Sequence, residues 1–148
     1  MVAGRAGGEV MVRSPGRFTE ISQDECLELM ATTTVGWLAF VDAEGQQLLP
    51  VNFALHGQDV YFRTMAGSAI STLADGHDDV AFAVDHHDDI YQKGWDVMAR
   101  GTTARVDDPD LVAQVAAGAR PRPWAPGERD VLIVLRPSVI SGRRVRRQ

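Results

Sequence analysis

The decisive stretch of this sequence is Tyr61-Phe62-Arg63-Thr64-Met65-Ala66-Gly67-Ser68-Ala69-Ile70. An alternating strand ends in Arg63-Thr64, a glycine-containing turn follows, and Ser68 opens a predicted helix. The arginine supplies charged donors, two hydroxyl groups supply neutral donors, and the start of a helix offers unpaired backbone N–H groups. The stretch therefore predicts a phosphate-binding site where a strand gives way to a helix.

Apolar segments separated by short turns lie on both sides of this stretch, and that arrangement is typical of antiparallel hairpins. Pro50 lies inside the second apolar segment and indicates an edge or a bulge there. The segment His86-His87-Asp88-Asp89 has the pattern of a polar interruption. The predicted strands span 34–41, 47–55, 59–64, 79–85, 94–106 and 130–136, and residues 138–145 either extend or follow the last one.

Helix signals lie between these segments. Ser22 and Glu25 form the pattern of a capping box, in which the hydroxyl accepts from the N–H of Glu25 and the carboxylate reaches back to the N–H of Ser22. Gly76 is a natural end for a helix. The predicted helices lie near 23–32, 68–75 and 109–117, and three prolines exclude regular structure from 120–127.

This order of elements predicts a mainly β protein of the α+β class, a six-stranded antiparallel split β-barrel with a few short helices. A sandwich is the alternative, because periodicity alone does not separate the two. We expect a flexible N-terminal arm over residues 1–17 and a single domain over 18–148.

Composition limits the possible functions. The chain has 148 residues and a net charge of −5, so one domain with a real core is expected and a nucleic-acid footprint over the whole surface is not. One cysteine excludes an intrachain disulfide and suits a reducing compartment. No apolar run approaches the roughly 18 residues of a membrane helix. We expect a cytoplasmic protein that binds neither nucleic acid nor membrane.

The order of motifs resembles the pyridoxamine 5'-phosphate oxidase-like flavoproteins, the split-barrel family that binds flavin mononucleotide (FMN). Among them it is most similar to the small actinobacterial-type members. No single motif is specific, but five in register are a fairly strong indication of the fold. The matching segments are 34–40, 49–53, 60–64 with Gly67-Ser68, 94–97 and 123–127.

The resemblance implies an FMN-dependent oxidoreductase with a small-molecule redox substrate, a homodimer with two FMN sites at the subunit interface. In this family a Pro-Val-Asn strand follows the flavin ring, and the Arg-Thr strand end with its turn holds the phosphate. The implied ring neighbours are Pro50, Val51 and Asn52. The implied ribityl or phosphate ligands are Arg63, Thr64 and Ser68. Trp95 and Trp124 would approach the site, in one arrangement from the other subunit.

Ala69 departs from the family pattern, because members usually carry a phosphate-binding lysine there. A charged hydrogen bond is worth about 1.5–3 kcal/mol, so its loss corresponds to roughly ten- to a hundredfold weaker FMN binding. Two alternatives to an FMN oxidoreductase follow. One is a deazaflavin-dependent reductase, whose acidic cofactor tail would need a basic groove, with Arg63, Arg100 and the C-terminal arginines as candidates. The other is a non-catalytic flavin-binding or sensing protein with weak or lost cofactor binding.

Other conspicuous residues have simpler interpretations. We expect Trp37 in the core and Cys26 as a buried thiol. His86 and His87 are adjacent on an extended segment and point to opposite faces, so we expect no metal site. Residues 143–147 are rich in arginine. We expect them to decorate a final strand and fray at its end, and the alternative is contact with nucleic acid or an anionic cofactor. No residue stands out as a catalytic acid or base.

Overall fold

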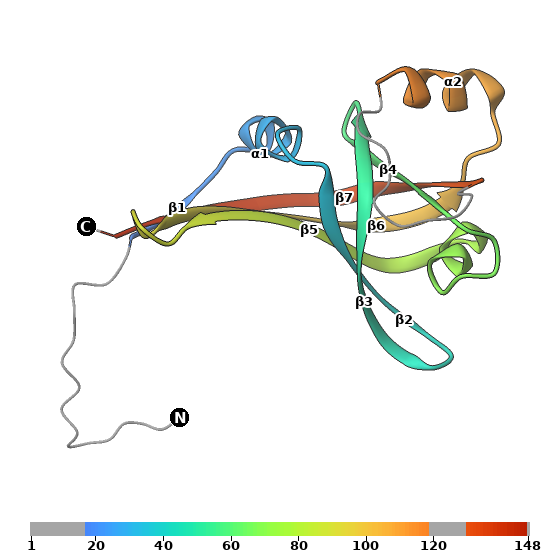
Figure 1. Ribbon diagram of the computed structural model, residues 1–148, viewed down its shortest axis with the longest axis horizontal. Helices are drawn as coiled ribbons and strands as arrows, with labels where there is room; N and C mark the ends of the chain where they lie inside the picture. The colour runs from blue at the N-terminus through green and yellow to red at the C-terminus, as the bar shows by residue number, and fades with distance from the viewer. Residues whose placement is uncertain (1–16, 119–129, 148) are drawn as a thin grey trace.

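The structure is a computed structural model that describes residues 17–118 and 130–147 (Figure 1). The predicted N-terminal arm, apart from Arg17, lies outside the described residues. The same is true of the irregular segment 120–127, and therefore of Trp124.

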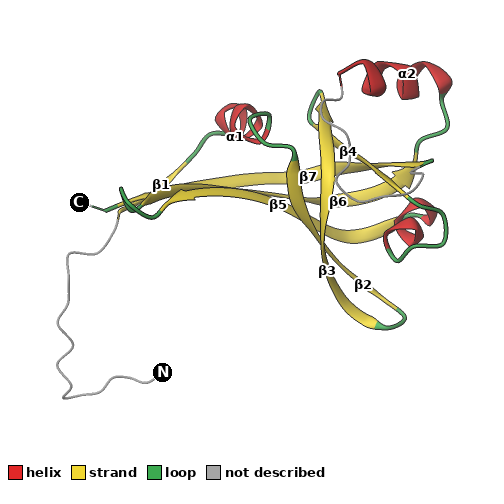
Figure 2. Cartoon of the chain, viewed as in Figure 1, coloured by secondary structure: helices red, strands yellow, loops and turns green. Residues whose placement is uncertain are grey.

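All pairings among the seven described strands are antiparallel (Figure 2). The sheet order is β1-β7-β4-β3-β2-β5-β6, and an additional β6–β7 pairing closes strands β2 to β7 into a ring. The strands are β1 Arg17–Glu20, β2 Val35–Asp42, β3 Gly45–His56, β4 Asp59–Thr64, β5 His77–Asp88, β6 Lys93–Arg105 and β7 Val131–Arg146.

The split-barrel prediction is confirmed, but the predicted number of strands is wrong. The six predicted strands form the ring, and the seventh, β1, pairs with the end of β7 outside it. The prediction that the polar segment 86–89 interrupts the sheet is also wrong. His86 and His87 remain in β5, because β5 pairs with β6 as far as Asp88 opposite Lys93. The last strand is continuous through Pro137, which lies beside a register shift in the β6–β7 ladder.

Two α-helices and one 3₁₀-helix join the strands: α1 Gln23–Met30, η1 Ile70–Asp75 and α2 Pro109–Gly118. The predicted cap of α1 is present, since the Ser22 hydroxyl accepts from the N–H of Glu25 at 3.2 Å. The carboxylate of Glu25 forms an ion pair with Arg144 of β7, which fixes α1 against the sheet. The second predicted helix is instead the short η1, which ends at Gly76 with φ of 96°.

The core lies inside the ring and follows the two-residue alternation of the strands. Leu38, Phe62 and Phe82 are essentially fully buried there, together with Cys26 of α1. A second cluster on the opposite face of β4 and β7 includes Tyr61 and packs with Val115 of α2. The core prediction for Trp37 is wrong, because this side chain points away from the ring and is 46% exposed in the single chain.

The β2–β3 hairpin extends beyond the rest of the ring (Figure 2). Residues 45–52 of β3 pair with β2, whereas the pairing of β3 with β4 covers only Phe53 to His56. Pro50 therefore lies in a segment with one strand partner among the described residues, in agreement with the predicted edge. Proline has no backbone N–H, and on the open side of an edge strand this removes no hydrogen bond between strands.

The β6–β7 closure gives a stability prediction. A Cβ atom at Gly101 would lie 2.0 Å from the carbonyl oxygen of Arg136, so backbone would have to move. Gly101→Ala should lower the free energy of unfolding by about 1–3 kcal/mol, as expected for overpacking. Gly118→Ala is the matched control, since nothing lies within 4 Å of its Cβ position. Chemical denaturation measures both, and equal midpoints for the two variants would contradict the tight β6–β7 contact.

Candidate functional site

The alternation of β3 separates the predicted site residues onto two faces. Pro50 lies opposite Trp37 and Asn52 opposite Val35, on the side of the hairpin that points away from the core. Val51, between them, is 7% exposed and belongs to the core cluster. We call the side of β2–β7 that points away from the ring the outer face. Pro50 and Asn52 lie on this face, and Val51 supports it from inside.

Arg63 lies on the outer face as well. Its cross-strand partner is Leu132, and Leu132 and the neighbouring Tyr61 both belong to the cluster outside the ring. The Arg63 side chain is partly exposed and makes no ion pair within residues 17–118 and 130–147. The structure thus brings Arg63, Asn52 and Pro50 to one face, with a positive charge at one end.

Thr64 and Ser68 form a hydroxyl pair on the inner side of the strand end. Their oxygen atoms are 2.7 Å apart, and Thr64 is only 5% exposed. The Ser68 hydroxyl also accepts from the N–H of Ser71 at 3.2 Å, and the Ser71 hydroxyl donates to the Ser68 carbonyl at 2.6 Å. Thr64 therefore orients Ser68, and the partly exposed Ser68 is the member of the pair that can reach a ligand.

Some of the N–H groups at this helix start already have acceptors within the turn. The segment folds as a six-residue 3₁₀-helix preceded by a tight turn. The N–H of Ser68 donates to the carbonyl of Met65 at 3.2 Å, and the N–H of Thr72 donates to that of Ala69 at 3.3 Å. These N–H groups are therefore used within the turn, and Arg63 supplies a full positive charge beside it.

Ala69, the departure from the family pattern, lies exposed at the N-cap position of η1. Its carbonyl oxygen accepts from the Thr72 hydroxyl at 2.7 Å, which fixes the backbone. A longer side chain at this position would extend into solvent beside Ser68 without disturbing the core.

Trp95 does not join this group within one chain. Trp95 pairs with Arg144 of β7, whereas Arg63 pairs with Leu132, twelve residues earlier on the same strand. At about 3.3 Å per residue this corresponds to roughly 40 Å. Figure 1 shows the two ends of the long β5–β6–β7 sheet far apart. A role for Trp95 beside Arg63 would therefore need a second subunit.

Where α2 does not cover it, the outer face is apolar and largely open in the single chain. A groove of about 910 Å³ crosses it, with Ala39, Leu48, Ala81, Arg100 and Val139 among its lining residues. Leu48 and Val41 are 65% and 62% exposed. Except for Arg100, sequence reasoning missed these residues. The sequence signal for this apolar face is the unbroken apolar run at 48–51, because a strand that is apolar on successive residues usually has both faces covered.

The structure also bears on the two other candidates from the sequence, a metal site and the Cys26 thiol. In the described part of the chain, no group of three or more His, Cys, Asp or Glu side chains is arranged to hold a metal ion. Cys26 is fully buried, and burial raises the pKa of its thiol, with smaller contributions from Glu25 and Asp96. The burial of Cys26 confirms the expectation of a buried thiol.

None of the helices described by the structure is long and apolar enough to span a membrane.

Comparison with known proteins identifies the family and agrees with the fold. Residues 22–144 match the family model described as pyridoxamine 5'-phosphate oxidase. The FAD binding protein from Mycobacterium smegmatis is 26% identical with a TM-score of 0.72, over 87% of this chain and 99% of that one. A candidate pyridoxamine 5'-phosphate oxidase from Corynebacterium glutamicum is 25% identical with a TM-score of 0.74, over 93% and 98% of the two chains.

A FAD-binding protein from Mesorhizobium loti, 17% identical with a TM-score of 0.67 over 89% of this chain and 99% of that one, shares the fold. The search of curated proteins found no match. The match to the family model covers most of the chain and confirms the resemblance drawn from the motifs, so this protein belongs to the pyridoxamine 5'-phosphate oxidase family.

Proposed function

We propose that this protein is a flavin-dependent oxidoreductase that works as a homodimer on a small-molecule redox substrate. The observation that carries the proposal is the arrangement on the outer face, where Pro50, Asn52 and Arg63 lie beside an open apolar surface. A bound flavin would supply hydride transfer, and the protein would supply binding and orientation.

The residues of the outer face fit a flavin ring and a phosphate. Pro50 and its cross-strand neighbour Trp37 offer an apolar surface for the ring. The Asn52 side-chain amide donates to the Thr34 carbonyl at 3.4 Å, which holds its orientation. Arg63 offers forked charged donors for the phosphate, and Ser68 offers a hydroxyl group. The apolar face would exclude water from one side of the ring.

Side chains with altered acidity do not suggest a catalytic acid or base. Apart from Cys26, the described group with a shifted pKa is Tyr61. Burial raises the pKa of Tyr61, Asp59 raises it further, and Arg136 partly opposes the shift. Tyr61 is 3% exposed, so it cannot reach a ligand on the outer face. The role left to this chain is to hold the cofactor and shape the pocket for the substrate.

FMN is the favoured cofactor, because Arg63 and Ser68 match the phosphate motif of the family. FAD is a second candidate, since the similar Mycobacterium smegmatis protein is described as FAD binding. A deazaflavin reductase is a third, and Arg100 in the outer groove would serve its acidic tail. A non-catalytic sensor is the alternative outside enzymes. The absorption spectrum of the purified protein, followed by titration with each cofactor, distinguishes these candidate functions. Failure of FMN, FAD and deazaflavin to bind would reject the proposal.

Arg63 should matter to cofactor binding more than to folding. Arg63→Ala should weaken FMN binding about ten- to a hundredfold, because a charged hydrogen bond is lost. Arg63→Lys should restore only part of the affinity, since lysine lacks the forked geometry. Fluorescence titration measures the affinity and thermal unfolding measures stability, which should change by no more than about 0.5 kcal/mol.

Arg143→Ala is the matched control, because Arg143 is exposed, pairs with Asp96 at 3.0 Å and lies eleven residues along β7 from Leu132, the cross-strand partner of Arg63. If Arg63→Ala unfolds the protein while FMN affinity per folded molecule is unchanged, Arg63 is structural and the phosphate assignment fails.

Ala69→Lys should tighten FMN binding. The new ammonium group would extend from the exposed N-cap of η1 beside Ser68, and we expect a gain of about 1–2 kcal/mol, reduced by solvent screening. The gain should decrease with added salt. Titration at two ionic strengths measures it, and an unchanged affinity would mean that the phosphate lies elsewhere.

The homodimer is proposed to form through the outer face. Exposed large apolar side chains mark interaction surfaces, and Trp37, Leu48 and Met98 are 46%, 65% and 41% exposed there. Leu48→Glu would place a charge in this contact and should shift the protein to a monomer in light scattering. Ile90→Glu is the control, because Ile90 is 86% exposed on a distant turn. A monomeric parent protein, or dissociation only by the control, would contradict this interface.

A further inference from the structure

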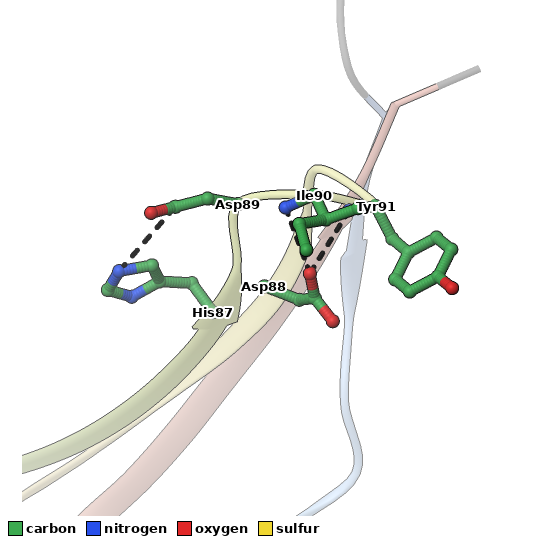
Figure 3. Close-up of polar contacts among 5 residues, drawn as sticks. All are labelled: His87, Asp88, Asp89, Ile90 and Tyr91. Carbon is green, nitrogen blue, oxygen red and sulfur yellow. Dashed lines mark hydrogen bonds and ion pairs between the residues drawn. The ribbon is translucent and has the colours of Figure 1, made fainter.

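The end of the β5–β6–β7 sheet opposite to Arg63 carries a preformed turn, shown in Figure 3. The Asp88 carboxylate accepts from the N–H of Ile90 at 3.0 Å and from the N–H of Tyr91 at 3.1 Å. His87 and Asp89 approach to 3.8 Å on the surface of the same turn. These contacts fix where β6 begins and therefore where its first side chains point.

A pocket of about 320 Å³ lies beside this turn. Its walls come from the facing ends of β5, β6 and β7, and we call it the tip pocket. Its lining side chains include His86, Asp88, Lys93, Trp95, Arg144 and Arg146.

The tip pocket concentrates positive charge. Lys93 and Arg146 lie directly opposite each other in the β6–β7 ladder, a placement that is destabilising for like charges. Within the described ranges neither makes an ion pair. The Lys93 ammonium lies 5.6 Å from the centroid of the Tyr91 ring. Asp88 lies directly opposite Lys93 on its other side, in the β5–β6 ladder, and offsets one of these two charges. Lys93 and Arg146 together therefore leave an excess of one positive charge over Asp88, which a bound anion would neutralise.

Most of the neighbouring arginines already have partners within the chain. Arg143 donates to Asp96 at 3.0 Å, and Arg144 pairs with Glu25. The backbone N–H of Arg147 donates to the carbonyl of Gln92 at 3.1 Å. Among the C-terminal arginines, Arg146 is therefore the one available to the pocket together with Lys93.

Aromatic groups form another part of the same pocket. Trp95 is partly buried and packs against the core, so its indole is held in place. The His86 ring lies 6.3 Å from it at an interplanar angle of 34°. Aromatic side chains of this kind stack on planar ligands, and nearby cations bind phosphate.

We propose that the tip pocket binds a mononucleotide, with its base against Trp95 and its phosphate between Lys93 and Arg146. The volume lies at the lower end of the range for small-molecule sites, about 300–1,000 Å³, which suits one nucleotide rather than two. Within one chain the pocket is roughly 40 Å along β7 from Arg63, so the proposal places it apart from the flavin site of the same subunit.

Calorimetric titration of the full-length protein with AMP, adenosine and inorganic phosphate tests this site. AMP should bind with one molecule per chain, and adenosine and phosphate should each bind at least about tenfold more weakly, because each offers half of the recognised chemistry. AMP affinity should fall with added salt. Absence of saturable AMP binding, or equal affinity for adenosine, would overturn the proposal.

Lys93→Gln and Arg146→Gln should each weaken AMP binding about three- to tenfold, an effect limited by solvent screening. Both positions are exposed, so the fold should survive either change. Arg105→Gln, at the far end of β6, is the control and should leave AMP affinity unchanged. Variants that bind AMP as tightly as the control would overturn the assignment. Equal weakening of FMN binding by the same two variants would also overturn it, because the pocket would then be part of the flavin site.

Discussion

The fold depends on closure of the strand ring between β6 and β7, where all of Lys93–Arg105 pairs with β7. Side chains alternate along a strand, so this register decides which residues face the core and which face outward. A slip of one residue in one of these strands would turn its buried side chains, such as Val97 of β6 or Ile133 of β7, toward solvent. The same closure leaves an apolar outer face, and it separates Arg63 from Trp95 by most of the length of β7.

Much of this architecture could be predicted from local sequence. The capping pattern at Ser22, the turn at Gly76 and the alternation around Arg63-Thr64 all correspond to observed elements. The predictions failed where long-range pairing overrides a polar composition. His86 and His87 look like an interruption, yet their backbone completes the β5–β6 ladder. The short strand β1 exists because it pairs with the end of β7, which no local pattern reveals.

The candidate site was predictable in part. Adjacent residues of a strand point to opposite faces, so Arg63 and Thr64 could not both have open contact with one ligand. The hydroxyl pair of Thr64 and Ser68 depends on how the chain turns after the strand, and a 3₁₀-helix was not expected there. Trp37 lies on the outward face of a strand that is apolar on both faces, and it is exposed in the single chain. An apolar pattern on both faces indicates that both are covered, but it does not identify what covers the outward one.

The central claim is that the outer face around Pro50 and Arg63 is the functional surface. Amide hydrogen exchange with and without saturating FMN tests it most directly, because residues 45–52 of β3 have a strand partner on one side only in the described structure and their outward amides should exchange readily. The account predicts that FMN slows exchange in residues 46–52 and 63–70 and leaves the inner core strands unchanged. Unchanged exchange in both segments, with protection confined to another part of the chain, would contradict it.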